Sequence, residues 1–328
     1  MHPSPEPVLS VRDLTSVFDL PGGTATAVDH VSFEIAAGET LGLVGESGSG
    51  KSVTAMSIVR LLRAPGRVAG GQVRFQGRDL MPLAEHEMRR IRGAGIGFVF
   101  QEPMTALDPV YTVGAQIREA LRVHAVASGK AADVRARELL DAVRIPDAAN
   151  RLRDYPHQLS GGMRQRVCMA IAIACRPALL IADEPTTALD VTIQAEILEL
   201  LRDMRQELGL AMLLITHDLG VVAETADRVA VMYAGRIVEQ GAVRDILRDP
   251  QHPYTRGLLA SLPGATHGQP LRPIAGSVPL LGAFPSGCSF HPRCPERFAP
   301  CDAAIPGAFH TGPGRSVRCF LHEDHAAR

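Results

Sequence analysis

The chain has 328 residues, 21% of them charged, and its 34 basic residues nearly balance its 35 acidic ones. This length allows one large domain and a smaller one, and the even balance excludes the broad field by which proteins gather nucleic acid or anionic membranes. The start, MHPSPEPVLSVRD, lacks the features of a secretory signal, and the longest apolar run, VCMAIAIAC, is shorter than the roughly 20 residues of a membrane-spanning helix. We therefore expect a cytoplasmic protein that reaches a membrane only through partners.

The first part of the chain is predicted to alternate strands with one helix. The segment TLGLV is a short buried strand that leads into a glycine-rich loop. A helix is expected after this loop, over residues 52–62. Apolar runs and alternation predict the strands of this part over residues 8–14, 30–35, 40–44, 70–80 and 95–101.

The middle of the chain is predicted to be mainly helical over residues 113–175 and then to return to strands. The apolar runs ALLIADEP and AMLLITHD are separated by a helical segment, which is the strand, helix, strand rhythm of a parallel sheet. The segment RVAVMYAGRIVEQG predicts a closing hairpin with its turn at Ala234–Gly235. Cys168 and Cys175 lie in an apolar helical pattern and are predicted to pack in the core.

The composition changes after about residue 250. The last 79 residues hold twelve of the 24 prolines and four of the six cysteines. We expect this segment to be a loop-rich appendage that cannot build a hydrophobic core of its own.

The segment GESGSGKS, from Gly45 to Ser52, fits the phosphate-loop pattern. Its backbone N–H groups can surround a β-phosphate, and the helix that follows presents its positive N-terminus. In this pattern Lys51 reaches the β- and γ-phosphates, and Ser52 coordinates Mg²⁺. The alternative, a simple glycine turn, is disfavoured because a buried strand precedes the loop and a helix follows it.

A second motif, LLIADEP, places two acids at the end of an apolar strand. Asp183 is suited to the metal shell, and Glu184 can orient and deprotonate a water in line with the γ-phosphate. Two acids at a buried strand end would be costly as structure alone. The pair is a weak signal by itself and a strong one beside a phosphate loop.

The third motif, LSGGMRQRV, predicts a second anion site. Ser160 can cap the helix that follows it, and Gly161 and Gly162 expose backbone N–H groups at the start of that helix. The alternative is an ordinary helix cap.

These motifs, together with LLITHD and ADEPTTALD, occur in the order found in the nucleotide-binding subunits of ATP-binding cassette (ABC) transporters, which residues 8–250 resemble. The resemblance implies an α/β phosphate-loop NTPase with a RecA-like parallel sheet, an N-terminal antiparallel part and a helical subdomain over about 102–176. Residues 1–250 would form this domain, and 251–328 a C-terminal extension. It also implies a head-to-tail dimer, whose site is completed by closure.

The resemblance further implies roles for individual residues. Glu184 would be the catalytic carboxylate, Gln101 the γ-phosphate sensor and His217 the switch histidine, although a lone histidine is more often a packed residue. No tyrosine precedes the phosphate loop, so Phe18 is the candidate to stack on adenine. Mg²⁺ would be held by Ser52, Gln101 and Asp183. ATP would be contacted by Phe18, Gly45, Ser47, Gly48, Gly50, Lys51, Ser52, Val53, Asp183, Ser160, Gly161, Gly162 and Asp190.

The tail segments HPYTRGLL, GSVPLL and GCSFHPRCP resemble the C-terminal extension of oligopeptide and dipeptide permease ATPases, a group that includes nickel and glutathione importers. This implies a subunit of a peptide importer at the cytoplasmic face of the inner membrane. Its partners would be two membrane-spanning permease subunits, a second related ATP-binding subunit and an extracytoplasmic binding protein, with no nucleic acid. A nickel or glutathione importer remains an alternative. A cassette ATPase of repair or translation is less favoured, because the chain has one phosphate loop and no coiled-coil or basic insertion.

Four cysteines of the tail, with five, six and seventeen residues between them, contain no CxxC pair and do not fit a common zinc ribbon. Four thiolates can hold an iron–sulfur cluster or Zn²⁺, and either would crosslink a tail with little core. Related proteins with this tail carry a four-iron cluster, so the resemblance implies a [4Fe–4S] cluster. Zn²⁺, unliganded thiols and a redox sensor that gates the ATPase are the alternatives. The residues are Cys288, Cys294, Cys301 and Cys319.

Overall fold

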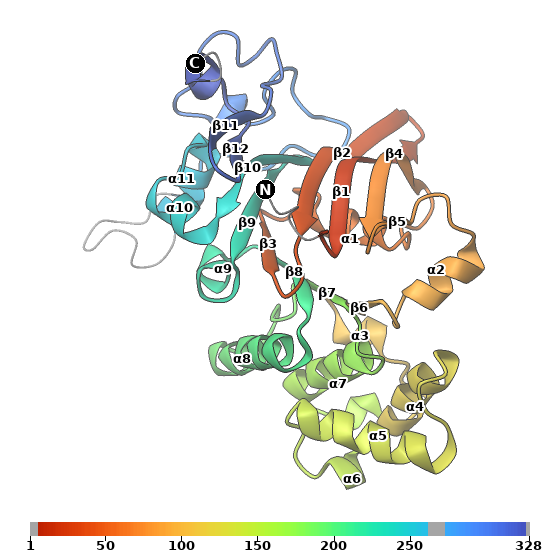
Figure 1. Cartoon of the computed structure of the whole chain (residues 1–328). Helices are drawn as coiled ribbons and strands as arrows, with labels where there is room; N and C mark the ends of the chain where they lie inside the picture. Colours follow the sequence, from red (N-terminus) through yellow and green to blue (C-terminus); the bar gives the residue numbers. More distant parts are fainter. Residues whose placement is uncertain (1–5, 262–272, 326–328) are drawn as a thin grey trace. The chain divides into compact units, whose positions relative to one another are not determined.

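A computed structural model describes residues 6–261 and 273–325, and the last two residues of the HPYTRGLLASLP segment, 262–263, lie outside this range. The described chain is mixed α/β and divides into two compact units (Figure 1). We call them the sheet unit and the helical unit. The helical unit comprises residues 6–8, 35–39 and 82–213, and the sheet unit comprises residues 9–34, 40–81, 214–261 and 273–325.

The N-terminal part of the sheet unit is a four-stranded antiparallel sheet with the order β2-β1-β4-β5. Strand β1 pairs with β4 from Leu9 opposite Phe75 to Phe18 opposite Gly66. More buried and less buried residues alternate along much of β2 and β4, as expected where one face of a sheet is covered. The strands are β1 (Leu9–Leu20), β2 (Gly23–Ile35), β4 (Gly66–Phe75) and β5 (Arg78–Asp79).

A second group of strands in the sheet unit has the order β11-β12-β10-β9-β3. Strand β3 runs parallel to β9, and the remaining neighbours are antiparallel. The predicted hairpin is confirmed, because Ala234 and Gly235 both have positive φ (45° and 81°), as a tight hairpin turn requires. The strands are β3 (Thr40–Val44), β9 (Arg228–Tyr233), β10 (Arg236–Ala242), β11 (Phe309–Gly312) and β12 (Arg315–Val317).

Helix α1 follows the glycine-rich loop but ends at Ile58 and not near residue 62 as predicted. Arg60 adopts a left-handed conformation (φ 54°), and the N–H of the next residue closes onto the Met56 carbonyl at 2.8 Å. A left-handed residue followed by this hydrogen bond is the Schellman motif, which ends a helix. The helices of this unit are α1 (Lys51–Ile58), α9 (Leu219–Thr225), α10 (Val243–Arg248) and α11 (Pro253–Ala260), with short 3₁₀ turns at His291–Arg293 and Phe320–His325.

The helical unit combines a parallel strand pair, β6 (Ile96–Val99) and β7 (Leu179–Asp183), with seven helices in the described chain. Helix α4 packs on both α5 and α7, as Figure 1 shows. Cys168 is buried in α7, as predicted, whereas Cys175 lies just beyond its end and is partly exposed. The unit boundary falls within β8 (Ala211–Thr216). The helices are α2 (Glu85–Ile91), α3 (Pro103–Ala106), α4 (Val113–Val123), α5 (Gly129–Ala142), α6 (Ala148–Arg151), α7 (Gly161–Ile173) and α8 (Val191–Leu208).

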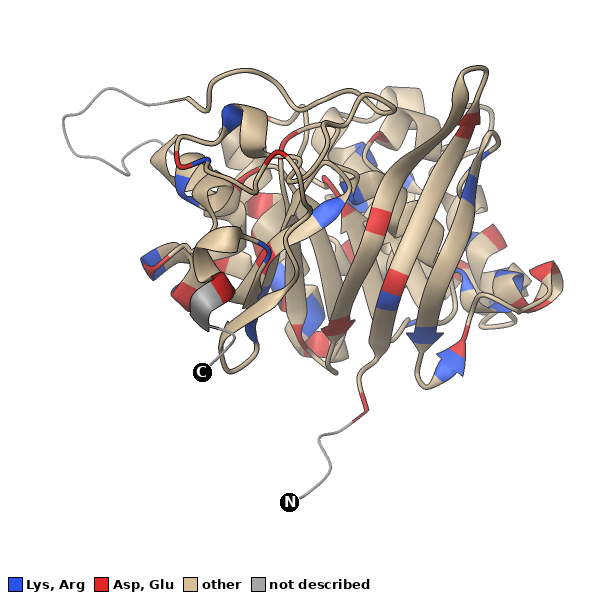
Figure 2. Cartoon of the chain, turned by 90° about the horizontal axis from the view of Figure 1, so that it is seen from above, with Lys and Arg blue, Asp and Glu red and all other residues tan. Residues whose placement is uncertain are grey.

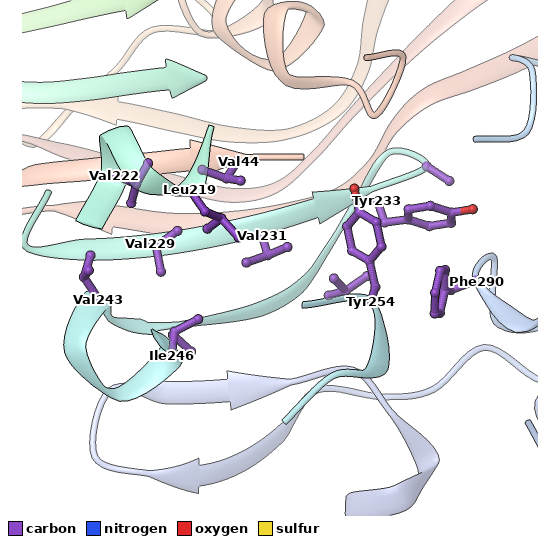
Figure 3. Close-up of a cluster of buried hydrophobic side chains, with 12 residues drawn as sticks. Val44, Leu219, Val222, Val229, Val231, Tyr233, Val243, Ile246, Tyr254 and Phe290 are labelled. Carbon is purple, nitrogen blue, oxygen red and sulfur yellow. The ribbon is translucent and has the colours of Figure 1, made fainter. Parts of the chain in front are cut away.

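The C-terminal segment buries two of its aromatic residues in the core of the sheet unit. Tyr254 and Phe290 pack against Tyr233 at the end of β9, with ring centroids 4.7 and 5.2 Å from that of Tyr233 (Figure 3). All three belong to one cluster of buried side chains. Each such aromatic pair adds about 0.5–1.5 kcal/mol beyond the burial of its area. The tail therefore gains its apolar burial by packing on β9.

A buried carboxylate fastens the same segment to β10. The side chain of Glu239 is fully buried and pairs with Arg315 at 3.2 Å. It also accepts hydrogen bonds from the backbone N–H groups of Gln251 and His252, at 2.8 and 3.0 Å. These donors satisfy a charge that would be costly to bury alone.

Among the described residues, no helix combines the length and the apolar character needed to cross a membrane. In the view of Figure 2, acidic and basic residues are interspersed along the strands and helices.

Candidate functional site

The phosphate-loop segment forms the turn between β3 and α1 in the sheet unit. A Cβ atom at Gly45 would lie 2.1 Å from the Met232 carbonyl oxygen, so a side chain cannot be accommodated there. Gly48 and Gly50 have φ values of +80° and +106°, which glycine adopts without strain. The backbone thus requires glycine where the sequence motif has it.

Lys51 begins α1, and its side chain bends back over the loop. Its Nζ donates to the carbonyls of Gly45 and Glu46 at 2.7 and 3.1 Å, and the residue is buried. The predicted loop residues lie in this turn and in the first residues of α1. They are Gly45, Ser47, Gly48, Gly50, Lys51, Ser52 and Val53.

Sequence reasoning missed the surroundings of Glu46, the second residue of the motif. Its backbone N–H donates to the Tyr254 hydroxyl at 2.9 Å, and its carboxylate accepts two hydrogen bonds from Arg293 at 3.0 and 3.1 Å. These partners lie more than 200 residues along the chain. No local pattern signals such a pairing.

The acidic motif of the helical unit lies at the carboxyl end of β7. Asp183 is the last residue of the strand and is buried. Glu184 follows in a left-handed conformation, φ 46°, which is uncommon for a residue with a side chain and is concentrated at functional sites. Its Oε2 atom accepts hydrogen bonds from Gln101 Nε2 at 3.0 Å and from Thr187 Oγ1 at 2.8 Å. These two hydrogen bonds fix the orientation of the Glu184 side chain.

The start of α7 has the predicted geometry. Ser160 is the N-cap, and its Oγ accepts from the N–H of Met163 at 3.3 Å. A Cβ atom at Gly162 would lie 2.7 Å from Ile193 of α8, whereas at Gly161 the nearest atom would be 3.6 Å away. Gly162 therefore allows close packing of α7 on α8, and Gly161 has room for a methyl group.

Asp190 has a structural role that the sequence analysis did not assign. It is the N-cap of α8, and its Oδ1 accepts from the N–H of Ile193 at 3.0 Å. An aspartate directly before a helical pattern is the usual signal for such a cap.

The remaining predicted residues lie in the sheet unit. Phe18 is half-buried on β1 opposite Gly66. His217 follows β8 directly and is exposed. The predicted nucleotide residues thus fall into two groups, one in each unit.

The four cysteines of the tail are the candidate metal ligands. Burial, together with the charges of Cys288, Cys294 and Cys301, raises the pKa of Cys319 to about 11. Over the described ranges, however, no three or more His, Cys, Asp or Glu side chains are arranged to hold a metal ion. Four cysteines are a donor set that suits a thiolate-bound metal, but their described side chains are not gathered in a ligating arrangement.

Comparison with protein families finds two matches along the chain. Residues 28–187 match the family model "ABC transporter", and residues 238–301 match "Oligopeptide/dipeptide transporter, C-terminal region". The chain is 51% identical to the dipeptide transport ATP-binding protein DppD of Bacillus subtilis, over 98% of this chain and 96% of that protein. It is 52% identical to a protein of Brucella melitensis named for peptide import, over 99% and 100% of the two chains.

Solved structures agree with this assignment. The ATP-binding cassette MJ0796, bound to ADP and phosphate as a dimer, is 29% identical and covers 72% of this chain and 99% of its own, with a TM-score of 0.65. The cbiO1 protein of Clostridium perfringens is 27% identical and covers 74% and 92%, with a TM-score of 0.64. The chain therefore belongs to the ABC transporter ATPases, in the group that carries the oligopeptide/dipeptide transporter C-terminal region.

Proposed function

We propose that this chain is the ATP-hydrolysing subunit of an importer of dipeptides or oligopeptides. The observation that carries the proposal is the joint presence of a complete cassette motif set and the C-terminal region that matches the oligopeptide/dipeptide family. Peptide is favoured over nickel or glutathione because the similar DppD protein is named for dipeptide transport. In this proposal residues 1–250 form the ATPase domain, and 251–328 form the extension.

The mechanism begins with the binding of ATP by the phosphate loop. Lys51 and the loop N–H groups hold the phosphates, and Phe18 stacks on adenine. Mg²⁺, when bound, neutralises charge on the β- and γ-phosphates, and its ligands would be Ser52, Gln101 and Asp183.

Hydrolysis itself is assigned to Glu184. The carboxylate accepts a proton from a water whose oxygen attacks the γ-phosphorus, and the bond from that phosphorus to the ADP oxygen breaks. The hydrogen bonds from Gln101 and Thr187 support this role, because they hold the side chain of Glu184 in one orientation. His217 would contact the γ-phosphate as the switch residue.

The proposed motor works as a head-to-tail dimer with a second, related ATP-binding subunit. Ser160, Gly161 and Gly162 would contact the γ-phosphate held by the opposite subunit, and Asp190 would lie at the same interface. The N–H groups at the start of α7 support this role, since a helix N-terminus attracts anions. Two membrane-spanning permease subunits and an extracytoplasmic binding protein complete the importer, and they hold this chain at the cytoplasmic face of the membrane.

Uptake by the assembled importer tests the cargo. We would reconstitute the permease, both ATPases and the binding protein in liposomes, and we would compare a dipeptide, a pentapeptide, Ni²⁺ and glutathione. The proposal expects peptide uptake that depends on ATP. Uptake of Ni²⁺ or glutathione without uptake of either peptide would contradict it.

We also propose that the four tail thiolates hold a [4Fe–4S] cluster, with Zn²⁺ as the alternative. The support is the donor set, since four cysteine thiolates are the ligand set of such a cluster. Iron, zinc and acid-labile sulfide would be measured in protein purified without oxygen, beside a Cys294→Ser variant. About four iron and four sulfide per chain, lost in the variant, are expected. Zinc without iron would establish the alternative, and absence of both metals would refute a metal site.

A further inference from the structure

The C-terminal segment reaches the phosphate loop through a buried phenol. Tyr254, the second residue of α11, is fully buried, and its ring centroid lies 4.7 Å from that of Tyr233 and 5.3 Å from that of Phe290 (Figure 3). Its hydroxyl accepts the backbone N–H of Glu46 at 2.9 Å. Burial raises the pKa of Tyr254 far above its ordinary range, so this group remains a neutral hydroxyl. The packed rings fix where that hydroxyl lies.

A second residue of the same segment holds the Glu46 side chain. Arg293 donates from both terminal nitrogens to the two carboxylate oxygens, and its side chain is only 6% exposed. Desolvation opposes the charge of the guanidinium, but its hydrogen bonds with Glu46 and Tyr233 outweigh this and raise the pKa of Arg293. The guanidinium also donates to the Ala275 carbonyl at 2.8 Å. A bidentate arginine pair of this kind has one defined geometry.

Glu46 is consequently held at three points. Tyr254 binds its N–H, Arg293 binds its carboxylate, and Lys51 donates to its carbonyl oxygen at 3.1 Å. Lys51 and the loop N–H groups are the atoms assigned to the phosphates of ATP. Because the start of the loop is already fixed before ATP binds, less conformational entropy is lost on binding.

We propose that Tyr254 and Arg293 are positioning residues, by which the C-terminal segment sets the phosphate loop in its ATP-binding geometry. This inference rests on the proposed function, in which the loop holds the phosphates of ATP. It extends the role of the segment from an appendage to a part of the nucleotide site. Neither residue needs to touch ATP, because both act through Glu46.

A purely structural role for these contacts makes a different prediction. If they only fasten the segment to the sheet unit, their loss lowers the unfolding temperature and leaves the affinity for ATP unchanged. If they position the loop, the affinity falls in protein that remains folded. The carboxylate of Glu46 separates positioning from simple electrostatics. Removal of its negative charge near the phosphates would by electrostatics alone tighten ATP binding, whereas loss of positioning would weaken it.

The test compares single-atom changes in the full-length chain within the assembled complex. Tyr254→Phe deletes the hydroxyl and keeps the packed ring. Glu46→Gln deletes the charge and leaves the bond of Arg293 to Ala275 in place. The matched control is Glu296→Gln, which breaks the ion pair with Arg256 (2.6 Å) at the surface of the same segment, where both side chains are 40% exposed.

We expect the dissociation constant for a fluorescent ATP analogue to rise about tenfold in Tyr254→Phe and in Glu46→Gln. The control should retain the parental value, and circular dichroism should show all three variants folded. Unchanged affinity in both test variants, or tighter binding in Glu46→Gln, would overturn the inference.

Lys51→Ala separates this inference from the proposed function. If Lys51→Ala loses ATP binding while Tyr254→Phe and Glu46→Gln retain it, the phosphate site stands and the positioning role fails. If Lys51→Ala binds ATP normally, the assigned phosphate site is wrong, and the positioning role falls with it.

Discussion

The side-chain amide of Gln101 donates a hydrogen bond of 3.0 Å to the carboxylate of Glu184, 83 residues further along the chain. The same oxygen accepts from Thr187 at 2.8 Å. Glu184 also has a left-handed backbone conformation, which restricts where its side chain can lie. Backbone and donors together define the orientation of the proposed base.

Thr187→Val should lower kcat for ATP hydrolysis by about tenfold, because it removes one of the two donors that orient Glu184. The KM for ATP should change little, since Thr187 is not among the residues assigned to ATP. Steady-state hydrolysis by the assembled complex checks this. Thr186→Val, one residue away and also half-buried, is the control and should retain the parental kcat. An equal loss in both variants would contradict the orienting role.

The two glycines that begin α7 should respond differently to substitution. Gly162→Ala forces a methyl group against Ile193 and should lower the unfolding temperature, whereas Gly161→Ala meets only Leu189 at 3.6 Å. If Gly161 contacts the γ-phosphate across the dimer, Gly161→Ala should reduce ATP-dependent dimerisation severalfold without a change in stability. Thermal unfolding and gel filtration with ATP measure the two effects. Normal dimerisation of Gly161→Ala would remove this residue from the interface.

Stability should fall as the pH is lowered through the titration range of free histidine. Burial, with the charges of Arg256 and His322, lowers the pKa of His252 to about 3, and its Nδ1 must stay unprotonated to accept the Tyr254 N–H at 3.0 Å. The unfolded chain binds this proton near pH 6.5 and the folded chain does not. This group therefore contributes stability above about pH 6.5, and the contribution declines towards pH 3 by about 1.4 kcal/mol per pH unit.

The His252→Asn variant can still cap α11 but cannot titrate. The prediction is checked by denaturant unfolding of the parent and of this variant between pH 5 and 8. The parent's advantage in free energy of unfolding over His252→Asn should narrow or reverse as the pH falls. The control variant His86→Asn, at an exposed site, should show the same pH dependence of this free energy as the parent. Parallel curves for parent and His252→Asn would show that His252 does not contribute to the pH dependence.

Removal of the proposed metal should weaken ATP binding, because Cys294 directly follows Arg293 in the chain. Loss of a ligand bond at Cys294 would loosen the guanidinium that holds Glu46. ATP affinity of the metal-loaded complex would be compared before and after chelation, with a severalfold loss expected. In Glu46→Gln, chelation should no longer lower the ATP affinity. A full response in that variant would mean that the metal acts by another route.

Local structure followed from the sequence wherever the signal was local. The buried strand, glycine loop and helix at residues 40–58, and the hairpin around Ala234–Gly235, depend on neighbouring residues, and both were predicted. The end of α1 was not, because its left-handed terminator is Arg60 and not glycine. An arginine in that position carries no sequence signal for a helix end.

In the candidate site, too, local features could be predicted from the sequence and long-range contacts could not. The motifs identified the residues, and they located Ser160 as the cap of α7 because a serine before a glycine-led helix is a local pattern. They could not pair Arg293 with Glu46 across 247 residues, since such a contact is set by tertiary packing. The C-terminal segment was for the same reason expected to be an appendage, whereas Tyr254 and Phe290 pack in the core of the sheet unit.

The most direct test of the whole account is ATP hydrolysis by the assembled complex carrying Glu184→Gln. The substitution keeps the shape of the side chain and removes the base, so turnover should fall at least about a hundredfold while ATP still binds and holds the dimer closed. Lys51→Ala should lose ATP binding itself, so a comparison of the two variants separates a defect in hydrolysis from a defect in ATP binding. Undiminished hydrolysis by Glu184→Gln would contradict the assignment of the catalytic carboxylate, and with it the proposed mechanism.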